Sequence, residues 1–104
     1  MYFRQHGTTR GGSAFDPATV EAVFRMGRIV PGRDPNLWRM DACGALMRRD
    51  LYGDTTPRGC GWEIDHVTPV AHGGSDALSN LQPLQWQNNR EKGDGPLRCA
   101  VRAA

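Results

Sequence analysis

The apolar positions near the start of the chain predict a short helix. Val20, Val23 and Phe24 recur at the spacing of one helix face. They follow Asp16 and a proline, a pairing typical of an N-cap and the first helical position. We expect a helix here that packs on the rest of the domain through one apolar stripe and ends with Gly27 as its C-cap.

The segment from residue 63 to residue 93 predicts the order strand, loop, strand and helix. Residues 63–67 alternate polar and apolar side chains, as a half-buried strand does. The loop 69–79 contains a Gly-Gly pair, and residues 81–84 form a second short strand, which its proline restricts to an edge or an irregular course. Residues 86–92 (WQNNREK) have helical composition and end at a glycine.

The other segments carry weaker patterns. Residues 1–14 show no periodicity and are expected to be a flexible arm, which leaves 15–104 as a single domain. Residues 30–41 are expected to connect elements, with Leu37 and Trp38 turned inward. Residues 43–52 are expected to be extended, and 53–61 are rich in turn residues.

The composition limits the class of protein. With 104 residues the chain forms one domain with a thin core, and 38% hydrophobic residues with 13 Gly and 7 Pro describe a loop-rich fold. No apolar run exceeds three residues, which excludes a transmembrane helix and a signal-peptide core. The expected location without a signal is the cytoplasm.

Charge and cysteine content add two observations. Of 13 basic residues 12 are Arg, whose planar fork binds phosphate; this bias fits a nucleic-acid partner and equally fits a GC-rich coding bias. The cysteines are Cys43, Cys60 and Cys99, an odd number without a C-x-x-C pair. They predict neither a disulfide framework nor a four-ligand zinc site, and reduced thiols are the simplest expectation.

Residues with metal and proton chemistry are concentrated between positions 63 and 93. Asp65 stands beside His66, an imidazole that titrates near neutral pH, and Asn88-Asn89 lies on the predicted helix. Carboxylate and carboxamide oxygens suit Mg²⁺ or Mn²⁺ more than zinc. A cation beside a neutral histidine is sufficient for phosphodiester hydrolysis. The alternatives are a surface ion pair and a solvated helix face.

Fixed intervals in the same segment resemble the HNH endonuclease family. The residues are WEIDHV, then Pro69, Gly73-Gly74 and Asp76, then NLQPL, and finally NNREKGD. The three named positions of the motif fall on His66, Asn80 and Asn89, at intervals of 14 and 9 residues. The close resemblance covers residues 62–94, and a weaker one extends upstream from Trp38 to Gly53.

This resemblance implies an α+β protein with a small ββα-metal (His-Me finger) core at about 61–94, here with an added N-terminal helix and short strands. In the family's scheme His66 is the general base, and Asp65 and Asn89 are metal ligands. Asn80 staples the loop between the strands and so holds His66 in place.

The resemblance also implies a substrate and a cofactor. The family cuts nucleic acid, usually double-stranded DNA, with one divalent metal, here Mg²⁺ with Mn²⁺ as the alternative; it implies no small-molecule cofactor and no membrane partner. The rival interpretation is a non-catalytic nucleic-acid-binding module of the same fold. The sequence leaves the oligomeric state open.

Three further residues are candidate nucleic-acid contacts. Arg90 and Lys92 follow the expected metal ligand on the helix, and His72 lies in the loop. Lys92 also suits a cation at a helix C-terminus, and His72 also suits an ordinary surface position. Glu63 and Asp76 are expected to be structural.

The chain departs from the family at the zinc site that many members carry. The second C-x-x-C pair is replaced by Gln85 and Asn88; of the first pair Cys43 remains, with Met40 three residues earlier. We therefore expect no structural zinc, and expect tryptophans and the upstream helix to supply packing instead. Adjacent side chains on a strand point to opposite faces, so we also expect irregular backbone at 65–66.

Overall fold

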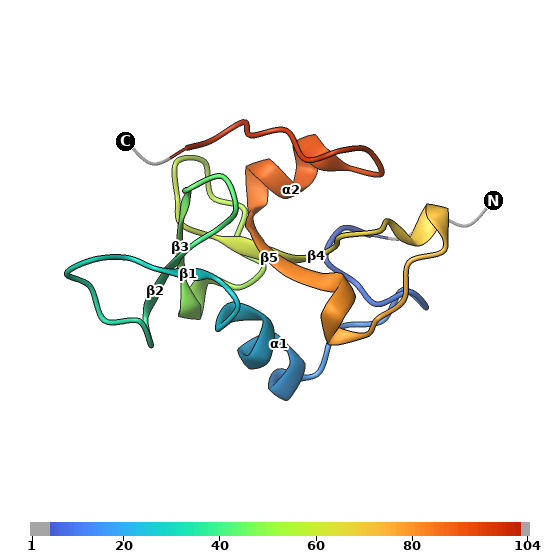
Figure 1. Cartoon of the computed structure of the whole chain (residues 1–104), viewed down its shortest axis with the longest axis horizontal. Helices are drawn as coiled ribbons and strands as arrows, with labels where there is room; N and C mark the ends of the chain where they lie inside the picture. Colours follow the sequence, from blue (N-terminus) through green and yellow to red (C-terminus); the bar gives the residue numbers. More distant parts are fainter. Residues whose placement is uncertain (1–4, 103–104) are drawn as a thin grey trace.

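The computed structural model describes residues 5–102 (Figure 1). Its regular elements are short and are connected by long loops. Three single turns of 3₁₀ helix lie at Arg49–Leu51, Val70–His72 and Leu78–Asn80. The helices and strands are α1 (Pro17–Phe24), β1 (Arg28–Ile29), β2 (Trp38–Met40), β3 (Leu46–Arg48), β4 (Trp62–His66), β5 (Leu81–Gln85) and α2 (Trp86–Lys92).

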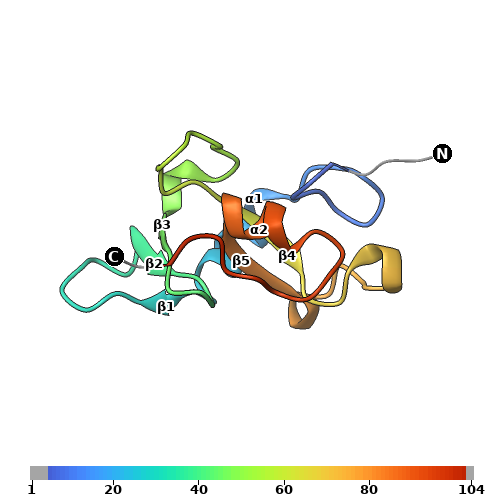
Figure 2. The same cartoon turned by 90° about the horizontal axis from the view of Figure 1, so that it is seen from above.

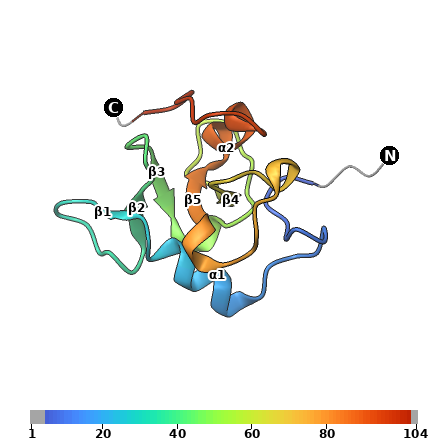
Figure 3. The same ribbon diagram turned by 45° about the vertical axis from the view of Figure 1, so that its right-hand side comes forward.

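The strands form two antiparallel sheets. One has the order β1-β2-β3, and the other is the pair β4-β5. Helices α1 and α2 lie on opposite sides of the β4-β5 pair (Figures 1 and 3). The unit of two antiparallel strands followed by a helix packed across them is the ββα arrangement, so the expected α+β class is confirmed.

Strand β4 is buried on both faces. Its residues Trp62 and Ile64 join the core formed with Phe24 of α1 and Met47 of β3. The Trp62 ring lies 5.3 Å from the ring of Phe24 and 4.9 Å from that of Tyr52. All five residues of β4 are buried, so the expectation of a half-buried strand is wrong. The polar alternate positions face α2, where partners satisfy them, rather than water.

Helix α1 begins as the sequence predicts and ends earlier. The Asp16 carboxylate accepts a hydrogen bond of 2.7 Å from Thr19 N, which caps the helix. The C-cap is Arg25 rather than Gly27. A Cβ on Gly27 would come within 2.7 Å of the Arg39 Cβ, so the glycine is required by a close approach between segments and not by a helix cap.

The expected connector 30–41 and the expected extended segment 43–52 differ from the structure. β1 and β2 pair as a hairpin, with Arg28 opposite Met40, and β3 extends the sheet before a 3₁₀ turn. Strands of two or three residues are too short to show periodicity, and cross-strand pairing forms them. Leu37 and Trp38 are half-buried rather than internal.

Cys43 and Cys99 form a disulfide, with their Cα atoms 5.6 Å apart. The expectation that all three cysteines are reduced thiols is therefore wrong, and Cys60 alone is unpaired. The bonded residues are 56 positions apart, and the segment after α2 returns alongside that helix to bring them together (Figure 2). Nothing local in the sequence marks such a pairing.

Within the predicted arm, residues 1–4 lie outside the described residues, and residues 5–14 contain no helix or strand. This part nevertheless contacts the domain, because Arg10 N donates to Asp76 Oδ1 and Tyr52 Oη donates to Gly7 O. The flexibility of the arm and the domain boundary at residue 15 stay predictions. Among the described helices none has the length and apolar character to cross a bilayer.

Candidate active site

Asp65 and His66 are the last two residues of β4. They pair with Gln82 and Leu81 in unbroken register, so the expected irregular backbone at 65–66 is wrong. Both residues still line one polar pocket of about 190 Å³, and adjacent strand residues therefore reach it without a bulge. The pocket is lined by His6, Gly7, Ile64, Asp65, His66, Asn89, Gly93 and Asp94.

The His66 ring is buried and bound to a carboxylate. Its Nε2 lies 2.7 Å from Asp76 Oδ1, and only 2% of the side chain is exposed. Burial raises the pKa of Asp76, but the hydrogen bonds from His66 and from Arg10 N outweigh it, so that the pKa lies below its ordinary value. A carboxylate acceptor places the proton on Nε2, which leaves Nδ1 as the basic nitrogen.

Asp65 is a buried carboxylate with a cationic neighbour. Its Oδ2 accepts a hydrogen bond of 2.8 Å from Gln82, and its Oδ1 lies 3.3 Å from Lys92 Nζ. Burial is the main cause that raises the pKa of Asp65 above its ordinary value, although the contacts with Gln82 and Lys92 oppose it.

Lys92 lies inside the protein rather than on the surface. Its Nζ donates to His66 O over 3.1 Å and contacts Asp65, and only 4% of the side chain is exposed. The expectation of a surface phosphate contact at Lys92 is corrected by this burial. The ammonium is the internal counter-ion of Asp65.

Asn80 links the two ends of the loop between β4 and β5. Its Oδ1 accepts from Thr68 N, and its Nδ2 donates to Thr68 O and Ser75 O. A Cβ on Gly74 would lie 1.7 Å from Thr68 O, so only glycine fits against this bonded segment. Asn80 does not line the pocket, and its contacts are with the loop.

Helix α2 brings Asn89 to the pocket. The helix covers Trp86–Lys92 with Gly93 as C-cap, as the sequence predicts. Asn89 Nδ2 donates to Glu63 Oε1 over 2.9 Å, which leaves the carboxamide oxygen as the atom that could bind a cation. Glu63 also accepts two hydrogen bonds from Arg90, and these raise the pKa of the guanidinium.

The other two candidate nucleic-acid contacts differ in position. Arg90 remains 42% exposed beside Glu63, so part of its guanidinium faces solvent. His72 lies in the exposed turn Val70–His72 and is not among the residues that line the pocket.

The pocket suits a hydrated hard cation better than a fully protein-ligated one. The described residues contain no group of three or more His, Cys, Asp or Glu side chains that could hold a metal. The pocket offers the Asp65 carboxylate and the Asn89 carboxamide oxygen. Mg²⁺ is typically bound by one or two carboxylates and keeps several waters, so this pair of oxygen ligands fits it.

Three residues support the site beyond those predicted as catalytic or metal-binding. Asp76 and Glu63, which the sequence predicts to be structural, lie in hydrogen-bond contact with His66 and Asn89 respectively. Glu63 stands two residues before Asp65, on the same face of the strand, and this spacing could have indicated it. His6 reaches the pocket from a segment without any pattern, so no sequence signal pointed to it.

Comparison with known proteins agrees with the ββα class. The family described as HNH endonuclease matches residues 54–95, which contain β4, the loop, β5 and α2. The resemblance seen in the sequence is thereby confirmed for residues 54–95, which match the HNH endonuclease family over less than half of the chain. No curated protein and no solved structure matches the chain.

Proposed function

We propose that the protein is a metal-dependent endonuclease that hydrolyses phosphodiester bonds of double-stranded DNA. The HNH domain indicates nuclease-type activity on nucleic acid. The observation that carries the finer proposal is the pocket in which Asp65, His66 and Asn89 meet. It combines a base with two oxygen ligands, the set that phosphodiester hydrolysis requires.

His66 is the general base. Nδ1 takes a proton from a water molecule, whose oxygen attacks phosphorus, and the bond from phosphorus to the 3′ oxygen breaks as a proton from solvent reaches the leaving oxygen. The products are a 5′-phosphate and a 3′-hydroxyl. Mg²⁺, or Mn²⁺ in its place, held by Asp65 and Asn89, would stabilise negative charge on the phosphate and the leaving oxygen.

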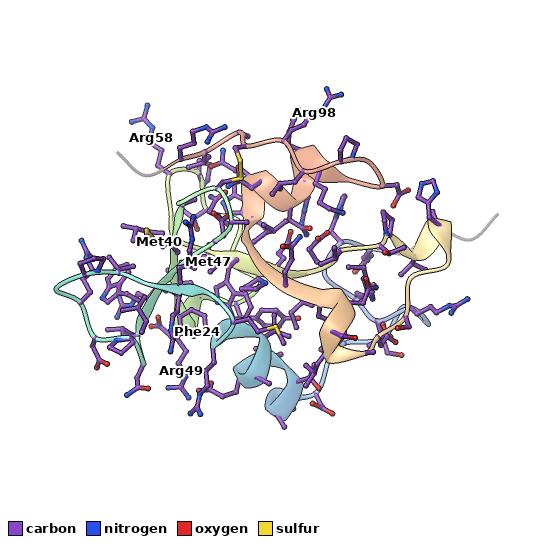
Figure 4. The ribbon with its side chains drawn as sticks, viewed as in Figure 1. Phe24, Met40, Met47, Arg49, Arg58 and Arg98 are labelled. Carbon is purple, nitrogen blue, oxygen red and sulfur yellow. A yellow bond between two sulfur atoms is a disulfide. The ribbon has the colours of Figure 1, made fainter. Side chains whose placement is uncertain are left out.

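Exposed arginines supply the phosphate contacts. Arg90 lies next to the pocket residue Asn89 and keeps part of its guanidinium in solvent. Figure 4 shows Arg58 and Arg98 pointing away from the body of the protein, and both are exposed. Arginine at the surface binds phosphate through a planar fork, independently of sequence.

One observation favours the rival function, a nucleic-acid-binding module without catalysis. Both oxygens of Asp65 have protein partners, Gln82 and Lys92, which compete with a cation for the carboxylate. A site in which these contacts persist would bind DNA and leave it intact.

Supercoiled plasmid distinguishes the two functions. With Mg²⁺ or Mn²⁺ we expect the wild type to nick or cut the plasmid, EDTA to stop it, and His66→Ala to abolish cutting while circular dichroism shows a folded protein. Glu91→Ala, an exposed change on α2, is the matched control and should cut at the wild-type rate. A wild type that only retards the plasmid, with either metal, establishes the binding module instead.

A further inference from the structure

We propose that Asp76 and the backbone N–H of Arg10 position His66, which makes residues 5–14 a working part of the nuclease site. This inference rests on the proposed function. It assigns a role to a carboxylate in the β4-β5 loop and to a segment outside the HNH match at residues 54–95.

The three groups form a continuous chain of hydrogen bonds. Arg10 N donates to Asp76 Oδ1 over 2.9 Å, and His66 Nε2 lies 2.7 Å from the same oxygen. The imidazole is 2% exposed, whereas the Asp76 side chain is 41% exposed and reaches His66 from the surface. A carboxylate held only by His66 could rotate, and the bond from Arg10 N restrains it.

Asp76 determines which nitrogen of His66 is basic. Among the described residues it is the hydrogen-bond partner of the imidazole, while Phe15 contacts the ring with centroids 5.9 Å apart. The aromatic contact restricts the ring plane and supplies no hydrogen bond. The carboxylate holds the proton on Nε2 and so keeps the lone pair on Nδ1.

The segment that carries Arg10 is itself anchored. Residues 9–13 form a turn, with Thr9 N bound to Ser13 O at 2.7 Å and Gly12 N bound to Thr9 O at 2.8 Å. Upstream, Gly7 O accepts from Tyr52 Oη over 3.3 Å. The segment thus lies beside the β4-β5 loop (Figures 1 and 3), and its turn presents the N–H of Arg10 to Asp76.

Two pairs of variants test whether Asp76 and the backbone N–H of Arg10 position His66. Asp76→Ala should lower kcat for plasmid nicking by about tenfold to a hundredfold, because small misplacement of a base costs this much. KM for the plasmid and the metal concentration for half-maximal cutting should stay within about twofold, because Asp76 is not among the residues that line the pocket. Asp76→Asn should keep most of the rate, since its carboxamide oxygen can accept both hydrogen bonds.

The second pair of variants tests the backbone N–H of Arg10. Arg10→Pro removes the N–H and should lower kcat in the same direction as Asp76→Ala, whereas Arg10→Ala keeps the N–H and should lower kcat less. Adding Asp76→Ala to His66→Ala should cause no further loss, because the position of an absent base has no effect. If Asp76→Ala fails to fold, the comparison of Arg10→Pro with Arg10→Ala tests the positioning of His66 instead.

The outcomes separate this inference from the proposed function. A wild type that never cuts overturns the proposed function. A wild type that cuts, with His66→Ala inactive and Asp76→Ala at the full rate, overturns only the positioning role. Equal losses in Asp76→Ala and Asp76→Asn, or equal rates in Arg10→Pro and Arg10→Ala, also contradict it.

Discussion

The side chains of Asp41 and Asn88 meet in the interior, where Asn88 Nδ2 donates to Asp41 Oδ2 over 2.9 Å. The same carboxylate accepts hydrogen bonds from three backbone N–H groups, and Asn88 also bonds both backbone polar groups of Val101. Asp41 is 1% exposed and Asn88 is fully buried. This network connects the turn between β2 and β3 with the start of α2.

Asp41→Ala should strongly destabilise the fold. It leaves four buried donors without their acceptor, and each unsatisfied group costs about 1–3 kcal/mol. We expect urea denaturation to show a loss of at least about 3 kcal/mol in the free energy of unfolding. Glu91→Ala should change it by less than about 0.5 kcal/mol. Equal effects of the two changes would show that the network does not stabilise the fold.

The disulfide should contribute measurably to stability. Cross-linking residues 56 positions apart restricts the unfolded chain, and such bonds typically add about 2–4 kcal/mol. Cys99→Ser should lower the free energy of unfolding by this amount under oxidising conditions. Cys60→Ser is the matched control because Cys60 is unpaired. A Cys99→Ser protein as stable as Cys60→Ser contradicts the prediction.

Removing the ammonium of Lys92 should destabilise the protein. Lys92→Met leaves the Asp65 carboxylate buried without its counter-ion, and breaking a buried pair from one side costs about 3–5 kcal/mol. Combining Lys92→Met with Asp65→Asn should cost less than the two single changes added together, because both remove the same pair. Strictly additive losses of unfolding free energy would mean that the two groups are not coupled.

Glu63 should affect metal binding without being a ligand. Glu63→Ala frees the Asn89 carboxamide, whose nitrogen the carboxylate now holds. Loss of such a supporting partner typically weakens metal affinity by about tenfold to a hundredfold. Titration calorimetry with Mn²⁺ measures the affinity, with Glu91→Ala as control. Unchanged affinity would show that Asn89 is oriented by other contacts, or that it is not a ligand.

Acid should destabilise the protein through its capping and paired carboxylates. Hydrogen bonds with Thr19 and Arg49 lower the pKa of Asp16 and Glu21 below their ordinary values of 3.8 and 4.5. A lowered pKa gives stability that is present above the ordinary value and is lost as the pH falls through the folded value. The raised pKa of Asp65 acts in the opposite direction.

Thermal denaturation between about pH 6 and pH 2.5 measures this effect, since the window spans the pKa values of carboxylates. Tm should fall once the pH drops below the ordinary values. Asp16→Asn keeps a capping oxygen that does not titrate in this range, so its Tm should fall less steeply. Parallel curves for the variant and the wild type would exclude Asp16 as a source of the pH dependence.

The sequence predicts the elements that local signals define. The capping aspartate at residue 16 and the terminal glycine at 93 mark the helices, and the fixed intervals of the motif locate β4, β5 and α2. Strands β1, β2 and β3 escape prediction because they form by pairing across loops. The burial of both faces of β4 also depends on elements distant in sequence.

The residues of the candidate site were likewise predictable only in part. Asp65, His66 and Asn89 are predicted from the motif, and the structure brings them to one pocket. Asp76, the partner of His66, depends on the path of a loop, and Arg10, which donates to Asp76, depends on a segment without periodicity. The inward turn of Lys92 depends on how closely α2 packs against β4, which residue types alone do not determine.

The bond between Cys43 and Cys99 closes the polypeptide into a ring that contains both strands and the helix of the HNH core. Within this ring the end of β4 and the face of α2 belong to one covalent macrocycle, whereas His6 and Gly7 reach the pocket from outside it. A protease that cuts the turn-rich stretch 53–60 once therefore opens the circle without releasing a fragment. The nicked chain keeps its original mass, apart from one added water, until a reductant separates it into two pieces.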